Sequence, residues 1–155
     1  MEGGKKGQEI VVMEGRIKIP YRWAAGETGT RYLQALRDEG RFLGMRCPDC
    51  EVVYHPPRRH CPDCGAECAQ WVELGRRGTL LTYTVVRRHH PQLAPLAPPF
   101  AYGIIRLEGA ETGFLHLLHE FAEGELRAGM EVEAVFAAER EGSMLDVKHF
   151  NLVET

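Results

Sequence analysis

The chain has 155 residues, 44% of them hydrophobic, which is enough for one domain with its own core or for a small module attached to one. Its net charge of -3 is unevenly distributed, because residues 1–100 carry 15 Lys and Arg against 11 Asp and Glu, whereas residues 101–155 carry 4 against 11. A dedicated nucleic-acid-binding protein has a dominant basic balance, since phosphate contacts supply most of its affinity, so the composition disfavours that class.

The sequence contains no run of 18 apolar residues, and its beginning, "MEGGKKGQE", has no apolar segment behind the lysines. We therefore expect neither a membrane span nor a signal peptide. The protein is expected to be cytoplasmic. In a reducing compartment, paired Cys-x-x-Cys motifs are more often metal ligands than disulfides.

Residues 1–26 are expected to form a flexible tail followed by an extended arm. The first nine residues are mostly Gly, Lys and Glu, and the short alternating stretch "IVVMEGRIKIP" then ends at Pro20. This stretch is predicted to be a strand or an extended arm.

Residues 27–40 are predicted to form a helical segment, with the helix itself over about residues 29–39. Thr28 or Thr30 can cap its start, and Gly40 can end it. An apolar stripe of Tyr, Leu and Leu in "TRYLQAL" would face the core.

Residues 41–70 are predicted to form a zinc ribbon. Two identical motifs, Cys-Pro-Asp-Cys, stand ten residues apart, and the flanking sequence alternates as in a small hairpin. Each motif can deliver two sulfur atoms to one tetrahedral metal ion, and Gly65 suits the positive φ that such a turn often needs. The predicted ligands are Cys47, Cys50, Cys61 and Cys64.

Four cysteine ligands leave no open position for water or substrate, so the expected zinc ion, one per chain, is structural. A ribbon this small has hardly any apolar interior, and metal binding should therefore supply much of its folding free energy. Iron in the same tetrahedral site is the main alternative, because thiolates alone do not distinguish the two metals. Disulfides are the other alternative.

Residues 71–155 are predicted to form a five-stranded OB-fold barrel, which makes the whole chain mainly β with one short N-terminal helical segment. Five β-rich runs are separated by Gly, Pro or charged turns: "TLLTYTVVRR", "FAYGIIRLEG", "GFLHLLHE", "GMEVEAVFAA" and "MLDVKHFNLV". The OB-fold is the common way to close five short strands, and another small barrel or a sandwich is the alternative.

Several remaining side chains are candidates for chemistry. Cys68 has no neighbouring base in the sequence and is expected to be a spare thiol. His116 and His119 stand three apart in a predicted strand and should point to opposite faces, which is poor geometry for a shared metal. His89 and His90 precede a Pro-rich stretch and are expected in a solvated loop.

Pairs of arginines lie between the two cysteine motifs, between ribbon and barrel, and at the end of the first barrel run. Guanidinium groups form forked hydrogen bonds with phosphates, so the pairs are candidates to bind coenzyme A (CoA) or single-stranded nucleic acid. The alternative is scattered surface arginines that keep the protein soluble. The candidates for CoA phosphates are Arg58, Arg59, Arg87 and Arg88.

No motif for a nucleophile, a phosphate loop or an acid/base pair is evident, which favours a binding or scaffolding role.

The two cysteine motifs, "PPR" at 56–58, "GTLLTYTVV" and "PPFAYGIIRLEGA" together resemble a family in which a rubredoxin-like zinc ribbon is fused to an OB-fold. The resemblance covers about residues 27–152.

That resemblance implies a non-catalytic partner of a thiolase-like or other acyl-CoA-processing enzyme, which sometimes helps to enclose CoA. The segment "IPYRWAAGETGTRYLQALRDEGRFLGMRC" is similar to members paired with thiolases of aromatic-compound degradation, such as the zinc-finger subunits of benzoylsuccinyl-CoA thiolases in toluene degradation. Residues 21–23 and 91–99 carry aromatic or apolar side chains suited to association. No residue for a particular substrate is implied.

Two other classes of function remain open. A nucleic-acid-binding OB-fold would use aromatic side chains such as Tyr83 and Tyr102 for stacking, although the acidic C-terminal part of the chain opposes it. An autonomous enzyme would be built around Cys68 or His89.

Overall fold

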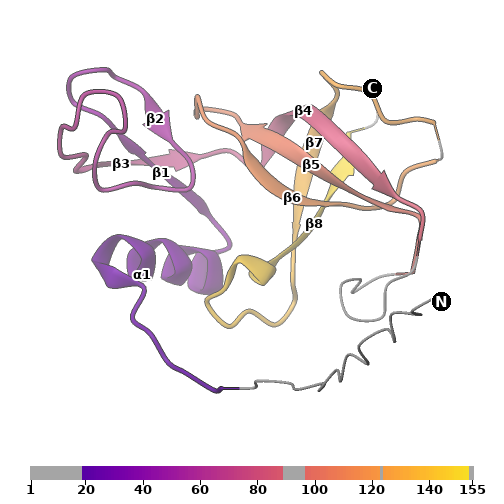
Figure 1. Ribbon diagram of the computed structural model, residues 1–155, viewed down its shortest axis with the longest axis horizontal. Coiled ribbons are helices and arrows are strands. Elements are labelled where there is room, and N and C mark those ends of the chain that lie inside the picture. The colour runs from indigo at the N-terminus through magenta and orange to yellow at the C-terminus, as the bar shows by residue number, and fades with distance from the viewer. Residues whose placement is uncertain (1–18, 89–96, 123, 154–155) are drawn as a thin grey trace, which may run out of the picture.

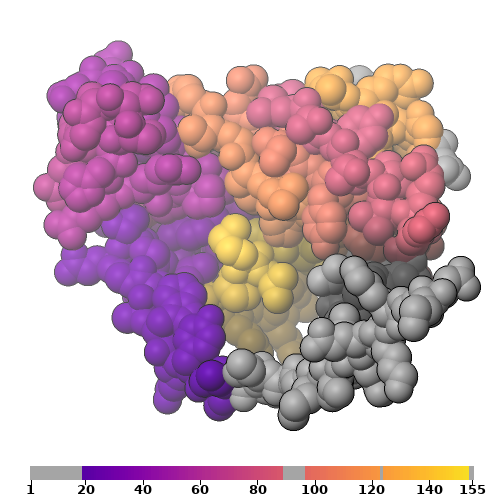
Figure 2. Space-filling view, in the orientation of Figure 1, coloured from indigo at the N-terminus to yellow at the C-terminus, as the bar shows by residue number. Residues whose placement is uncertain are grey.

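A computed structural model describes residues 19–88, 97–122 and 124–153. Figure 1 shows a small sheet and a helix on one side of the molecule and a β-barrel on the other, and Figure 2 shows the same two parts in contact as solid surfaces. The expected tail, most of the expected arm, His89, His90 and most of the loop at 91–99 lie outside the described residues.

The predicted helical segment is confirmed, with different details. Helix α1 (Gly26–Gln34) continues directly into the single π-helical turn η1 (Ala35–Glu39), and Gly40 ends it at φ 58°, as expected. The expected threonine caps are wrong, because the chain is already helical at Gly26 and both threonines lie inside α1. No helix among the described residues is long and apolar enough to cross a membrane.

The ribbon is a three-stranded antiparallel sheet in the order β2-β1-β3. Strands β1 and β2 form the expected hairpin around the first cysteine motif, and β3 pairs with β1 along its whole length. The expected boundary at residues 70 and 71 falls inside β3, which therefore belongs to the ribbon sheet. The strands are β1 (Phe42–Arg46), β2 (Val53–Tyr54) and β3 (Gln70–Leu74).

Five strands close into a barrel in the order β4-β5-β6-β8-β7, which confirms the predicted OB-fold. Neighbours are antiparallel except β6 and β8, and β4 closes the barrel by pairing with both β5 and β7. The strands are β4 (Arg77–Val86), β5 (Phe100–Leu107), β6 (Phe114–Leu118), β7 (Glu131–Phe136) and β8 (Val147–Leu152).

The last β-rich run begins with a 3₁₀ turn, η2 (Met144–Asp146), in place of strand. The side chain of Ser143 accepts a hydrogen bond from the turn, and the Asp146 carboxylate accepts one from the backbone N–H of Ser143. This reciprocal pair satisfies polar groups that a strand would leave to its neighbours.

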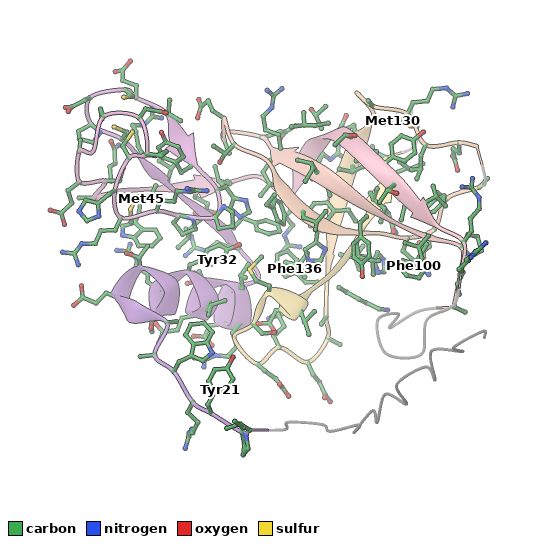
Figure 3. The ribbon with its side chains drawn as sticks, in the orientation of Figure 1. Tyr21, Tyr32, Met45, Phe100, Met130 and Phe136 are labelled. Atoms are coloured by element: carbon green, nitrogen blue, oxygen red, sulfur yellow. The ribbon has the colours of Figure 1, made fainter. Side chains whose placement is uncertain are left out.

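One hydrophobic core joins the helix, the ribbon and the barrel. The ring of Phe42 on β1 is fully buried, and its centroid lies 5.2 Å from that of Phe136 and 6.2 Å from those of Phe114 and Phe150 on the barrel strands. Figure 3 shows Phe136 beside the end of the helix. The ribbon is therefore held against the barrel by packed rings, and the cysteine motifs project from it.

Candidate metal centre

The four predicted cysteine ligands converge at the ribbon. Their sulfur atoms all lie within 4.8 Å of one another, with 3.6 Å between Cys47 and Cys64 and 3.9 Å between Cys50 and Cys61. Four thiolates about 2.3 Å from a tetrahedral zinc ion would stand about 3.8 Å apart. The arrangement fits a closed four-sulfur site.

Both motifs fold into the same turn. The backbone N–H of Glu51 donates to the carbonyl of Cys47 at 3.1 Å, and the N–H of Gly65 donates to the carbonyl of Cys61 at 3.0 Å. Gly65 has φ 78°, as the sequence suggested, and Glu51 takes the same left-handed position with φ 60°. The first turn thus adopts its conformation without a glycine.

Sequence reasoning missed Tyr54, which lies beside the sulfur cluster. Its hydroxyl is 3.1 Å from Sγ of Cys61 and 3.1 Å from a carboxylate oxygen of Asp63. The hydrogen bond from Tyr54, assisted by the backbone N–H of Cys64, lowers the pKa of Cys61 to about 6. The thiolate is the form that binds a metal, so Tyr54 favours the ligand form.

Cys68 lies outside this group of four. Its side chain is buried, and Sγ is 3.9 Å from the carbonyl oxygen of Ala66. Burial raises the pKa of the Cys68 thiol, which disfavours the reactive thiolate. The thiol packs in a small cluster with Met45 and Tyr54.

The structure does not bring the four candidate arginines together. Arg58 and Arg59 are exposed in the ribbon after β2, and Arg59 forms an ion pair of 3.2 Å with Glu67. Arg87 and Arg88 are exposed just beyond the C-terminal end of β4. Figure 1 shows β2 and that end of β4 at opposite ends of the molecule.

The arginine pair between ribbon and barrel has structural contacts. Arg76 donates to the carbonyl of Gly40 at 3.1 Å, and its guanidinium lies 5.0 Å from the centre of the Phe136 ring. Arg77 forms ion pairs of 3.1 and 3.4 Å with Glu131 and Glu133 on β7. These two side chains therefore tie the helix end to the barrel and β4 to β7.

His116 and His119 have different surroundings. The His116 ring packs between Phe114 and Phe150, at centroid distances of 5.8 and 5.6 Å, and burial lowers its pKa. His119 lies just after β6, where its ring centroid is 5.1 Å from that of His149.

Two family models match consecutive segments of the chain. The model described as "ChsH2, rubredoxin-like zinc ribbon domain" matches residues 35–67, and that described as "ChsH2, C-terminal OB-fold domain" matches residues 71–137. Their order is the order of the ribbon and the barrel in the structure.

Similar curated proteins include two described as DUF35 domain-containing scaffold proteins. That of Pyrococcus furiosus is 29% identical over 112 residues, which cover 72% of this chain and 80% of the relative. That of Methanocaldococcus jannaschii is 35% identical over 98 residues, which cover 61% and 67%. A probable enoyl-CoA hydratase alpha subunit of Thermomonospora curvata is 30% identical over 93 residues, which cover 59% of this chain and 28% of that protein.

Two solved structures share the fold. One, an Ltp2-ChsH2(DUF35) aldolase, has a TM-score of 0.63 and 24% identity, covering 84% of this chain and 98% of the matched chain. A DUF35-family protein of unknown function from Sulfolobus solfataricus has a TM-score of 0.61 and 19% identity, covering 82% and 84%. With the family models and the curated relatives, they confirm the resemblance suggested by the motifs: this chain belongs to the DUF35 family, with a rubredoxin-like zinc ribbon followed by an OB-fold domain.

Proposed function

We propose that this chain is a non-catalytic scaffold subunit that docks onto an acyl-CoA-processing enzyme in the cytoplasm. The names of its relatives support the proposal, since two are scaffold proteins and one is a probable enoyl-CoA hydratase subunit. The Ltp2-ChsH2(DUF35) aldolase, which has the same fold, combines a DUF35 protein with aldolase activity in its name.

The observation that carries the proposal is an exposed apolar stretch before α1. Ile19, Tyr21 and Trp23 are 71%, 78% and 74% exposed, and Figure 3 shows Tyr21 on the side of α1 that faces away from the ribbon. Burial of each such side chain contributes about 1.5–3 kcal/mol, and tryptophan and tyrosine often dominate interfaces. These three residues, the aromatic arm, are the proposed docking surface.

We propose further that the partner is of the thiolase type and acts in aromatic-compound degradation, such as that of toluene. The support is the similarity of the segment "IPYRWAAGETGTRYLQALRDEGRFLGMRC" to thiolase-paired family members, and this segment contains Tyr21 and Trp23 of the aromatic arm. On this proposal the partner supplies the residues for carbon–carbon bond cleavage.

The proposed role of Cys47, Cys50, Cys61 and Cys64 is to hold one structural zinc ion. The sulfur separations fit a tetrahedral ion, and the matching family model is a zinc ribbon. With four protein ligands the ion has no position for a substrate, so its part is to stabilise the ribbon.

CoA contact by the surface arginines is a separate proposal. Because β2 and the end of β4 lie at opposite ends of the molecule, we propose that CoA contacts one pair, Arg58 and Arg59 or Arg87 and Arg88, and not the other. In the purified complex, reversing the charge of one pair should raise the KM for the CoA substrate, and reversing the other should not. An unchanged KM in both double variants would exclude these arginines.

Affinity purification of the full chain from its native host tests the scaffold proposal. We expect a thiolase-type subunit to co-purify, and the double variant Tyr21→Ser/Trp23→Ser to lose it. Leu81→Ser, which removes a less exposed leucine on the barrel, is the matched control and should retain the partner.

The chain purified alone should catalyse no thiolysis of an acyl-CoA substrate. Turnover by the isolated chain would refute the scaffold proposal. If the double variant retained the partner, the aromatic arm would not be the docking surface. If an enzyme of another class co-purified, the proposal that the partner is a thiolase would be wrong.

A further inference from the structure

A second cluster of possible metal ligands lies on the barrel, far from the cysteines in sequence. His119, Glu120 and His149 each offer one ligand atom, and these three atoms lie within 4.8 Å of one another. They line a cavity of about 530 Å³ between the end of β6 and the segment η2–β8. Figure 2 shows these two segments, coloured orange and yellow, meeting on the visible face beside α1.

The barrel topology brings the three residues together. Strand β8 runs parallel to β6 with Leu118 opposite Phe150, and the backbone N–H of His119 donates to the carbonyl of Phe150 at 3.0 Å. Phe150 is fully buried in the core, so its neighbours His149 and Asn151 point together to the other face of β8. The side chains of His149 and Asn151 therefore lie beside the residues at the end of β6.

Glu120 is held in position by its backbone and by a neighbour. Its φ of 58° lies in the left-handed region, which is uncommon for a residue with a side chain. The amide of Asn151 donates to one carboxylate oxygen of Glu120 at 2.7 Å. The other oxygen is left facing Nδ1 of His119, 4.0 Å away.

The histidine nitrogen beside this oxygen is incompletely satisfied. Nδ1 of His119 is buried and has no hydrogen-bond partner among the described residues, although its ring edge reaches solvent. Leaving a buried polar atom without a partner is unfavourable, and a metal ion between this nitrogen and the carboxylate would satisfy both groups. The adjacent His149 is only 5% exposed, which keeps its imidazole near the same point.

We propose that His119, Glu120 and His149 bind a divalent transition-metal ion, with Zn²⁺ the best fit. Ligands about 2.0–2.2 Å from a tetrahedral ion stand about 3.4 Å apart. Side-chain rotations would have to bring the three ligand atoms, which lie within 4.8 Å of one another and 4.0 Å apart for His119 and Glu120, to that separation. Two imidazoles and one carboxylate suit zinc better than calcium or magnesium, which prefer oxygen ligands. The hydrogen bond from Asn151 to Glu120 is the outer contact that orients a metal-binding carboxylate.

This site differs from the cysteine site in having three protein ligands. A fourth position is therefore open to water or to an oxygen-bearing ligand in the cavity. Leu115 and Leu145, which line the cavity and are 62% and 81% exposed, would place apolar surface beside that position.

Zinc analysis of the full chain, after loading with ZnCl₂ and dialysis against metal-free buffer, tests the proposal. We expect a second equivalent of zinc per chain beyond the one held by the cysteines. His119→Ala and His149→Ala should each lose this second equivalent and keep the first. Lys148→Ala changes an exposed residue that lines the same cavity and should retain both.

Cobalt substitution gives an independent readout. The second equivalent of Co²⁺ should produce d–d bands without the thiolate charge-transfer band of a cysteine site, and these bands should vanish in His149→Ala. Circular dichroism shows whether each variant is folded, and in His119→Ala, which changes a part-exposed side chain, folding is expected to be unaffected. A wild-type chain that retains a single zinc, or a second equivalent that survives both histidine substitutions, would overturn the proposal.

Discussion

The imidazole of His55 lies where the helix, the ribbon and the barrel meet. It is 1% exposed, Nε2 is 3.0 Å from the hydroxyl of Tyr32 on α1, and its ring centroid is 4.5 Å from that of Phe114 on β6. Its backbone N–H and carbonyl both form hydrogen bonds with the hydroxyl of Thr112. This one residue therefore contacts all three parts of the fold.

The stability of the protein should fall in mild acid because of His55. Burial, with a smaller contribution from nearby His116, lowers its pKa to about 3. The unfolded chain takes up a proton near pH 6.5 and the folded chain does not, so stability is complete above about pH 6.5 and falls by up to ~1.4 kcal/mol per pH unit below it, until the folded pKa is reached.

The variant His55→Gln should lack the part of the acid-induced loss of stability that arises from His55. Between pH 7 and pH 5.5, the unfolding free energy measured with urea should fall by about 1 kcal/mol more in the wild type than in the variant. The cysteine cluster is the same in both proteins, so its acid sensitivity cancels in the comparison. If the unfolding free energy fell equally with pH in the wild type and the variant, His55 would not be the cause of the pH dependence.

Strand β4 is the element that closes the barrel, and Gly78 lies where it meets both neighbours. Gly78 is opposite Leu107 on β5 and Val132 on β7. A Cβ atom at this position would lie 2.6 Å from the carbonyl oxygen of Arg106. Because that atom belongs to the backbone of a paired strand, it cannot move aside as a side chain would.

Gly78→Ala should therefore destabilise the barrel by about 1–3 kcal/mol, as overpacking of a closed structure does. Thr82→Ala, which changes an exposed residue on the same strand, is the matched control and should lower the free energy of unfolding by less. The measurement is the urea midpoint of each variant. A Gly78→Ala protein as stable as the control would mean that β4 and β5 do not approach this closely.

The whole molecule has two unequal centres of packing. The large core is shared by α1, the ribbon strands and the barrel, whereas the small cluster at the metal centre consists of a few buried side chains around the thiols, namely Met45, Cys47, Tyr54, Cys61 and Cys68. A cluster this small does not bury enough apolar surface to order its loops without a metal.

Removal of zinc with a chelator should therefore unfold the cysteine turns and leave the barrel folded. In hydrogen exchange, the amides of Glu51 and Gly65 should lose protection while those of β4 to β8 keep theirs. Cys61→Ser should have the same effect as the chelator, and Cys68→Ser, a buried thiol outside the group of four, should not. Full protection of both turns in the metal-free chain would contradict the structural role of the metal.

The parts of the fold that sequence reasoning predicted depend on local signals. The five barrel runs alternate and end at turn residues, Gly40 ends the helix, and the first cysteine motif sits in a hairpin. The misplaced threonine caps show the limit of such signals, because the helix begins at Gly26 after Ala25, with no side-chain cap. The left-handed Glu51 carries no marker in the sequence, since the turn imposes that conformation on it.

Local sequence patterns did not predict which residues far apart in the chain lie close together in the structure. The sequence predicted that His116 and His119 are a poor metal pair, although His119 lies just outside β6. It did not reveal that His149, thirty residues after His119, lies beside it across a parallel strand pair. For the same reason it did not reveal Tyr54 as a neighbour of Cys61, or that β2 and the end of β4, which the two outer arginine pairs follow in the chain, lie at opposite ends of the molecule.

By itself the sequence determined the class of fold and the grouping of four thiols, because strand periodicity and two short, identical cysteine turns are encoded within a few neighbouring residues. Only the tertiary structure decided what surrounds those thiols, which histidines meet on the barrel, and which apolar side chains before α1 stay exposed. These depend on strand order and on packing between distant segments, which no local pattern specifies.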